Sequence, residues 1–348
     1  MRPKMLAKLL DQYITGVKAG QEVPALLVEA EPGVGKTSLV RQAAQRAASF
    51  LHELHLLFKE PVDFSGVPQV IKGRTRWCPP EDLVPPDLPD HGVLLLEEVA
   101  QLEGPMQKAL GPVLLEKRFG NLRLPANWLV VGTGNRAQDR AGALKLLSHL
   151  RNRVIRVKLD ASLEDFQAWG LETGRICTEV RCYLEFRKAH LLNFVPEKDQ
   201  QDATPRSWEM ASQVLKVVSK DLRPEVLAGC VGQGVASEVE AFLQVWEDLP
   251  DVKKVLADPT GLPIPKELSV IYAAVGMLAD SVADSKNGDM TGLTTYAVRL
   301  PKEFSTLYMK CALANLQADK KRKAQFLGLD VVEEWIRKNQ DILAAAVS

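Results

Sequence analysis

The chain has 348 residues, of which 46% are hydrophobic and 25% charged, and its 44 basic and 44 acidic side chains leave no net formal charge. These fractions are typical of a globular protein and exclude a disordered one. Zero net charge excludes a generally basic nucleic-acid coat protein, but not a local basic patch. At roughly 150 residues per domain, the length predicts about two domains.

The sequence indicates neither a membrane span nor a disulfide framework. No stretch approaches the ~18 uninterrupted apolar residues that a span requires, and residues 1–10 lack the apolar core of a signal peptide. The five cysteines are odd in number and include no C-x-x-C pair, so we expect reduced thiols. We therefore expect a cytoplasmic protein with no membrane partner.

The first half of the chain alternates helical and strand-like patterns. Residues 4–19 follow the i, i+3, i+4 spacing of an amphipathic helix. Short apolar runs predict strands at residues 25–29, 54–58, 93–96, 128–133 and 154–159, and a helix is predicted at residues 36–48. This alternation predicts a parallel α/β sheet over residues 20–160. The Pro- and Gly-rich residues 61–90 are expected to be irregular or hairpin-like, and helical patterns dominate after residue 160.

The first predicted strand is followed by Ala30-Glu31-Pro32-Gly33-Val34-Gly35-Lys36-Thr37. This string matches the phosphate-binding P-loop, except that Ala30 stands at the first glycine position. Backbone N–H groups of such a loop cradle phosphate oxygens, so we expect Lys36 to reach the β- and γ-phosphates and Thr37 to ligate Mg²⁺. A loop of this kind does not distinguish ATP from GTP. The expected nucleotide-binding residues are Pro32, Gly33, Val34, Gly35, Lys36, Thr37 and Ser38.

Two acidic residues, Glu97 and Glu98, follow the strand predicted at residues 93–96. The first acid is expected to hold Mg²⁺, usually through water, and the second to orient the attacking water. The usual first acid is Asp, and the longer side chain of Glu97 puts the strength of the Mg²⁺ site in question. The alternative is a strand that ends in two solvated carboxylates.

Three further features resemble those of AAA+ ATPases and occur in the expected order. Asn135, after the strand at residues 128–133, resembles the polar sensor 1 residue that positions the lytic water. Arg153, with Arg151 as second choice, resembles the arginine finger that reaches the γ-phosphate of a neighbouring subunit. Thr204 and Pro205 are suited to a helix start, which places Arg206 where sensor 2 contacts the nucleotide from a helical lid.

Two longer strings are similar to the MoxR-like group of AAA+ proteins. One runs from Asp63–Pro68 to Arg74–Pro80, and the other covers Asn135–Gly142 before the segment at residues 150–153. The resemblance implies an α/β P-loop AAA+ core with a parallel sheet at residues 1–160, an all-α lid at 161–235 and a helical C-terminal region at 236–348. It also implies ATP and Mg²⁺ as cofactors.

The same resemblance implies a function and partners. We expect an ATP-hydrolysing motor that works as a ring, with a hexamer as the expected size, and that remodels a protein client in the manner of a chaperone. A protein with a von Willebrand factor A domain is an expected partner. Two alternatives stay open: a motor or loader on nucleic acid, which zero net charge disfavours, and a nucleotide-binding switch with little turnover, which Ala30 and Glu97 make conceivable.

Overall fold

The computed structural model describes residues 1–136, 144, 146–195, 200–247, 249, 251–285, 287–317 and 319–339. The chain divides into two compact units, each with a hydrophobic core of its own. The first unit comprises Met1–Asp165, Phe194–Asp199 and Thr204–Arg206, and the second comprises Phe166–Asn193, Gln200–Ala203 and Ser207–Ser348. The three-part domain division expected from the sequence stays a prediction.

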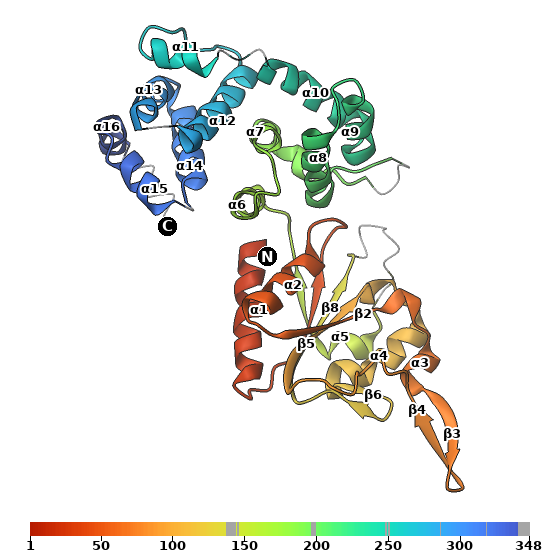
Figure 1. Cartoon of the computed structure of the whole chain (residues 1–348). Coiled ribbons are helices and arrows are strands. Elements are labelled where there is room, and N and C mark those ends of the chain that lie inside the picture. Colours follow the sequence, from red (N-terminus) through yellow and green to blue (C-terminus); the bar gives the residue numbers. More distant parts are fainter. Residues whose placement is uncertain are drawn as a thin grey trace. The chain divides into compact units, whose positions relative to one another are not determined.

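A five-stranded parallel sheet forms the centre of the first unit (Figure 1). Its strand order is β2-β5-β8-β1-β9, and every neighbouring pair is parallel. All side chains of β1 are buried, as expected of an apolar run covered on both faces. The strands are β1 (Ala25–Glu29), β2 (Phe50–His55), β5 (His91–Glu97), β8 (Asn127–Gly134) and β9 (Val154–Lys158).

Helices cover both faces of this sheet. α1 and α2 pack together on one face, and α4 and α5 lie on the other (Figure 1). The predicted amphipathic helix is α1, which buries Leu6, Leu10, Ile14 and Val17. The helices of this unit are α1 (Pro3–Lys18), α2 (Lys36–Arg46), α3 (Pro61–Ser65), α4 (Gly104–Glu116) and α5 (Ser148–Arg151), with 3₁₀ turns η1 (Leu56–Phe58) and η2 (Val99–Gln101).

The strand predicted at residues 54–58 is wrong in position. The strand is β2, which ends at His55, and the next three residues form η1. β2 lies at the edge of the sheet and pairs only with β5, and the polar residues His52, Glu53 and His55 interrupt its apolar pattern. The leucines that suggested a strand do not share one environment, because Leu56 is fully buried whereas Leu57 is 52% exposed.

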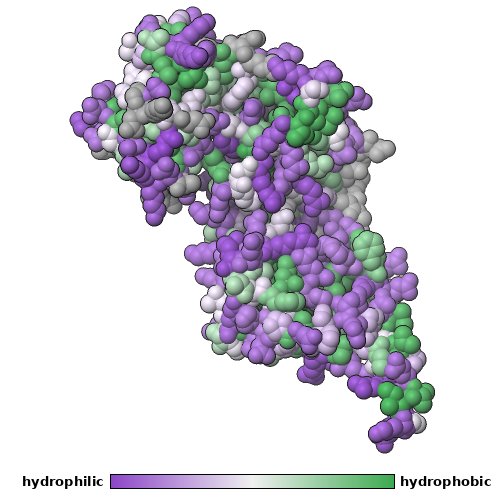
Figure 2. Space-filling model, viewed as in Figure 1, coloured by the Kyte–Doolittle hydropathy of each residue, from purple (hydrophilic) through white to green (hydrophobic). Residues whose placement is uncertain are grey.

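The segment expected to be hairpin-like contains the antiparallel pair β3 (Val67–Ile71) and β4 (Arg74–Cys78). Every residue of β3 is exposed, and Val70 is 78% exposed. Figure 2 shows apolar atoms on the outside of this hairpin. Its own hydrogen-bonded ladder therefore holds the hairpin, and core burial contributes little. A second small hairpin joins β6 (Arg118–Phe119) to β7 (Leu122–Arg123).

The chain after β9 is helical, as expected. In the core of the second unit, α12 packs against α14, and the fully buried Tyr308 shares a hydrogen bond of 2.9 Å with Thr294. The helices are α6 (Leu163–Thr173), α7 (Thr178–Phe186), η4 (Lys188–Leu191), α8 (Pro205–Val217), α9 (Arg223–Val231), α10 (Gln233–Glu247), α11 (Val252–Ala257), α12 (Leu268–Asp284), α13 (Asn287–Ala297), α14 (Lys302–Asn315), α15 (Lys320–Leu327) and α16 (Asp330–Lys338). The fold class is therefore confirmed: an α/β P-loop core with a parallel sheet is followed by helices.

All five cysteines are free, which confirms the expected thiols. Among the described residues, no helix combines the length and the apolar character that crossing a membrane requires.

The core of the sheet generates a first prediction. Trp128 is fully buried, and its Nε1 donates to the Pro89 carbonyl at 2.9 Å. We expect Trp128→Ala to lower the free energy of unfolding by about 3–5 kcal/mol, because it leaves a large cavity. The matched control is Trp77→Ala in the hairpin, where the ring is 46% exposed, and we expect a change within about 0.5 kcal/mol. Urea denaturation measures both, and similar losses would contradict the assigned burial.

Candidate functional site

The residues between β1 and α2 form a phosphate-binding loop with the expected backbone. Gly33 and Gly35 have φ angles of +75° and +102°, a left-handed conformation that side chains with a Cβ rarely adopt. Ala30 is fully buried, and its N–H donates to the Gly134 carbonyl at 3.3 Å. Ala30 has no positive φ, so the alanine fits the first position without strain. The loop is thus a P-loop in conformation as well as in sequence.

Both oxygens of Glu97, at the end of β5, are engaged by side chains that the sequence reading did not anticipate. Oε1 lies 3.3 Å from Nη2 of Arg41, and Oε2 lies 2.8 Å from Nδ1 of His55. Arg41 follows Thr37 by four residues on α2, so the two share one helix face. The Arg41 contact shows that this face is turned toward the end of β5, which brings Thr37 and Glu97 to the same region.

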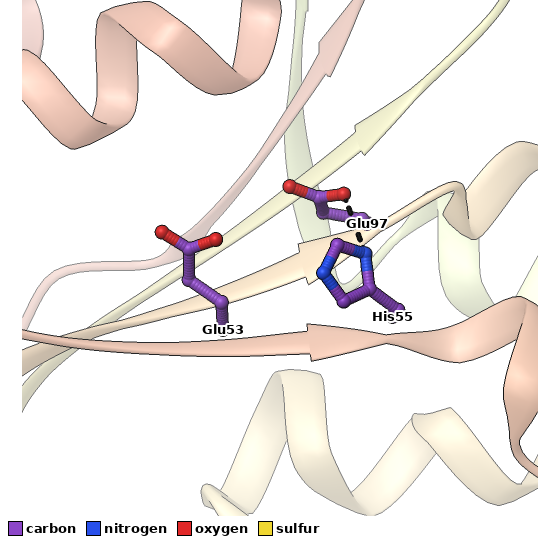
Figure 3. A group of neighbouring side chains, drawn as sticks. All are labelled: Glu53, His55 and Glu97. Carbon is purple, nitrogen blue, oxygen red and sulfur yellow. Dashed lines mark ion pairs between the residues drawn. The ribbon is translucent and has the colours of Figure 1, made fainter.

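Glu97 belongs to a group of neighbouring polar side chains at the ends of β2 and β5 (Figure 3). One ligand atom each of Glu53, His55 and Glu97 lies within 4.8 Å of the others, a donor set that metal ions also use. Arg41 donates to both oxygens of Glu53 at 2.8 and 2.6 Å, and this hydrogen bonding holds the pKa of Glu53 below its ordinary value. Because Arg41 already pairs with both carboxylates, we interpret the group as a clamp on Glu97 rather than as a separate metal site.

Glu98, the second acid, has two unusual features. Its backbone is left-handed, with φ 60° and ψ 35°, a conformation that costs a residue with a side chain about 1–3 kcal/mol and that is frequent at functional sites. Its Oε2 is buried and has no hydrogen-bond partner among the described residues. A buried carboxylate oxygen without a donor has full capacity to accept a hydrogen bond from a water molecule.

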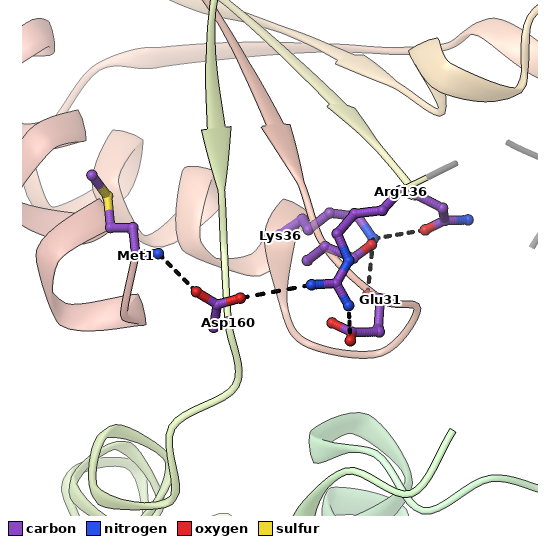
Figure 4. A network of polar contacts seen from close by, with 7 residues as sticks. Met1, Glu31, Lys36, Arg136 and Asp160 are labelled. Carbon is purple, nitrogen blue, oxygen red and sulfur yellow. Dashed lines mark hydrogen bonds and ion pairs between the residues drawn. The ribbon is translucent and has the colours of Figure 1, made fainter. Parts of the chain in front are cut away.

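Lys36 and Asn135 meet at the carboxyl edge of the sheet, and Figure 4 shows the Lys36 side chain there. Lys36 is only 8% exposed, and its Nζ donates to Asn135 Oδ1 at 2.8 Å. The same amine donates to the carbonyls of Ala30 and Glu31 at 3.2 Å. This meeting follows from the pairing of β1 with β8, because the loop and Asn135 come after adjacent parallel strands. The ammonium group is therefore held at the place where the loop presents its N–H groups.

Arg136 is a site residue that the sequence reading missed. Its guanidinium pairs with the P-loop residue Glu31 and lies 3.6 Å from Asp160 after β9 (Figure 4). The Arg136 side chain is only 14% exposed, so this ion pair is partly desolvated and positions the loop from its outer side. The only available sequence signal was its place directly after Asn135. The rest of the Asn135–Gly142 string, residues 137–142, lies outside the described residues.

The first turn of α8 lies directly on the P-loop. α8 begins at Pro205, as expected, and the Arg206 N–H donates to the Gly33 carbonyl at 3.1 Å. A Cβ on Gly33 would lie 2.4 Å from Oγ1 of Thr204. The structure thus brings Arg206 to the nucleotide loop. The Arg206 side chain is exposed and makes no hydrogen bond or ion pair within the described part of the chain, which leaves it available to a phosphate.

Arg153 is not brought together with the other candidates. β9 runs parallel to β1 with Val154 opposite Ala25, so Arg153 precedes the amino end of the sheet whereas the P-loop follows its carboxyl end. The strand between them spans about 16 Å at ~3.3 Å per residue. Arg153 is half-buried and Arg151 is exposed, and neither has an ion-pair partner among the described residues. The Arg153 guanidinium is thus remote from its own chain's loop.

The donor set at the carboxyl edge fits a nucleoside triphosphate with Mg²⁺. The Thr37 hydroxyl and the Glu97 carboxylate supply the oxygen ligands that Mg²⁺ prefers. The loop N–H groups and the Lys36 ammonium are suited to phosphate oxygens. The sheet and the loop together define a P-loop nucleotide-binding fold. The individual catalytic and binding roles of these residues stay predictions.

No family model and no curated protein matches this sequence. Among solved structures, the chain is similar to RuvB of Thermotoga maritima, a Holliday junction branch migration motor, at 16% identity and a TM-score of 0.40, over 83% of this chain and 85% of that one. It is also similar to NtrX from Brucella abortus in complex with ADP, at 14% identity and a TM-score of 0.32, over 97% of this chain and 68% of that one. At these identities and TM-scores, function must be argued from the residues of this chain.

The contact between Gly33 and Thr204 generates a second prediction. We expect Gly33→Ala to weaken nucleotide binding by about ten-fold or more, which is about 1.4 kcal/mol. The new Cβ in the P-loop would collide with Thr204, which precedes α8. The matched control is Gly20→Ala, where φ is +78° but nothing lies within 4 Å of the Cβ. Both variants carry the same backbone strain. Titration with a fluorescent ATP analogue measures the difference, and equal affinities would contradict the steric argument.

Proposed function

We propose that this protein is an ATP-hydrolysing motor of the AAA+ class that works as a ring-shaped oligomer. The observation that carries the proposal is the buried Glu98 carboxylate oxygen without a partner, held by a strained backbone at the sheet edge where Lys36 and Asn135 meet. A loop that only binds nucleotide does not require such a group. A water-orienting carboxylate does, because it must accept a hydrogen bond from the attacking water.

Each residue has one step in the proposed reaction. The loop N–H groups and Lys36 bind the β- and γ-phosphates of ATP, and Thr37 and Glu97 hold Mg²⁺. The metal ion supplies neutralisation of charge on the phosphate oxygens when it is bound. Glu98 orients and polarises a water molecule for attack on the γ-phosphorus, and Asn135 positions the same water. The bond between the γ-phosphorus and the bridging oxygen breaks, and the products are ADP and inorganic phosphate.

The position of Arg153 supports an oligomer. An arginine that precedes the amino end of β9 does not reach the phosphates bound after the carboxyl end of β1 in the same chain. Its guanidinium also has no anion among the described residues. Both facts are as expected if Arg153 stabilises transition-state charge on ATP bound to a neighbouring copy. A closed ring gives every copy one such neighbour, and the MoxR-like resemblance favours a hexamer.

The contact of α8 with the P-loop supports a motor rather than a passive binder. The hydrogen bond from Arg206 to Gly33 joins the nucleotide loop to the first turn of a long helix. When ATP is bound, its γ-phosphate attracts the Arg206 guanidinium at the start of α8. When hydrolysis removes the γ-phosphate, this attraction ends and the force on α8 changes. The resemblance to MoxR-like proteins and the zero net charge favour a protein client, with a von Willebrand factor A domain protein as the expected partner.

The role of Glu98 generates a third prediction. We expect Glu98→Gln to bind ATP as wild type does but to lower its turnover by about 10²–10⁴-fold, because the neutral amide polarises the attacking water less than a carboxylate and cannot take a proton from it. The matched control is Glu103→Gln, an exposed residue for which we expect full activity. Phosphate release with Mg²⁺ measures turnover. Equal rates for both variants would contradict the assignment, and a wild type without turnover would favour the nucleotide switch.

Subunit mixing generates a fourth prediction. Arg153→Ala and Lys36→Ala are each expected to lose ATP turnover when assayed alone. When the two are mixed, the intact loop of the first variant meets the intact Arg153 of the second, so we expect a substantial fraction of the activity to return. Failure to recover activity in mixed oligomers of confirmed composition would contradict action between subunits. Stimulation of wild-type turnover by DNA but not by protein would favour the nucleic-acid alternative.

A further inference from the structure

Gly111 lies in the interior of α4, where glycine lowers helix stability relative to alanine. The next residue, Pro112, offers one reason for a glycine, because the proline ring crowds a Cβ on the residue before it. α4 contains a second Gly-Pro pair, Gly104 and Pro105, at its start. The two glycines share this local context, but they differ in what surrounds them.

The guanidinium of Arg153 lies on the bare backbone of Gly111. A Cβ built on Gly111 would be 2.4 Å from Nη1 of Arg153, about 1 Å short of the 3.4 Å at which ordinary van der Waals contact begins. The next atoms are Cζ of Arg153 at 3.7 Å and Cδ2 of His149 at 3.8 Å. A Cβ built on Gly104 would meet nothing within 4 Å. The crowding at Gly111 is therefore specific to the Arg153 guanidinium.

This packing restrains the Arg153 guanidinium without pairing its charge. No hydrogen bond or ion pair holds the group within that part of the chain, and a free arginine side chain has many rotamers. Packing on the backbone of Gly111 limits where the guanidinium lies, but it does not neutralise the positive charge. An unneutralised but positioned cation is what a neighbouring phosphate requires.

We propose that Gly111 is a positioning residue for the arginine finger. Its bare backbone holds the guanidinium of Arg153 in the position from which it contacts the phosphates bound to a neighbouring copy. This inference rests on the proposed function. The atom that a Cβ would meet is the far end of a flexible side chain and not backbone, so Gly111→Ala displaces the guanidinium and leaves the fold in place. A displacement of about 1 Å at a reacting centre lowers rates by about 10²-fold.

The experiment compares Gly111→Ala with Gly104→Ala in the full chain. Both variants add one methyl group before a proline of the same helix. We expect Gly111→Ala to lower kcat for ATP hydrolysis by about 10²-fold, with unchanged affinity for a fluorescent ATP analogue, since the P-loop is untouched. We expect Gly104→Ala to keep wild-type kcat. A Gly111→Ala variant with wild-type kcat would overturn the inference.

A double-mutant cycle separates positioning from a purely structural effect. If Gly111 acts through Arg153, adding Gly111→Ala to Arg153→Ala lowers kcat no further. A further fall in the double variant would show that Gly111 acts by another route and would overturn the inference. If Gly111→Ala does not fold, the same comparison is made in a Pro112→Ala background. That background removes the crowding of the new Cβ by the proline ring but keeps its crowding by Arg153.

The outcomes for the two variants distinguish failure of the role of Gly111 from failure of the proposed function. Wild-type kcat in Arg153→Ala would mean that Arg153 is no finger, and both would fail together. Loss of turnover in Arg153→Ala, with full turnover in Gly111→Ala, would leave the proposed function in place and overturn only the role of Gly111.

Discussion

The parallel pairing of β1 with β8, and of β8 with β5, is the constraint on which the nucleotide end of the first unit depends. Parallel strands direct their carboxyl ends to one edge, so the P-loop, Asn135 and the two glutamates converge although they lie far apart in sequence. The hydrogen bond between Lys36 and Asn135 is the direct sign of this convergence. A ligand at the carboxyl edge of an open α/β sheet is the usual arrangement for such folds.

The charges at this edge fall into two kinds. Glu97 and Glu31 are held by partners, the first by Arg41 and His55 and the second by Arg136. These pairs fix the positions of the Glu97 side chain, which is proposed to hold Mg²⁺, and of the loop. Their effect is positional, because each pair holds a side chain or a loop in one place.

Glu98, Arg153 and Arg206 form the second kind, since each carries a group without a partner among the described residues. An unpaired polar atom that is buried has a cost in free energy, so its presence requires a reason. One acceptor for water and two cations for phosphate are the groups that hydrolysis of a nucleoside triphosphate uses. The molecule thus compensates the charges that hold the site and leaves open those that would act on a substrate.

The sequence by itself determined the P-loop, the buried strands and the start of α8. These features depend on local rules, because glycine permits left-handed backbone at Gly33 and Gly35, fully buried strands require continuous apolar runs, and Pro205 is suited to a first helical turn. Only the tertiary structure decided the limits of the edge strand β2, the clamp on Glu97, the pairing of Arg136 with Glu31, the left-handed backbone of Glu98 and the contact of Arg153 with Gly111. Each of these depends on which distant segments become neighbours, and strand order and register set that proximity without leaving a local pattern in the sequence.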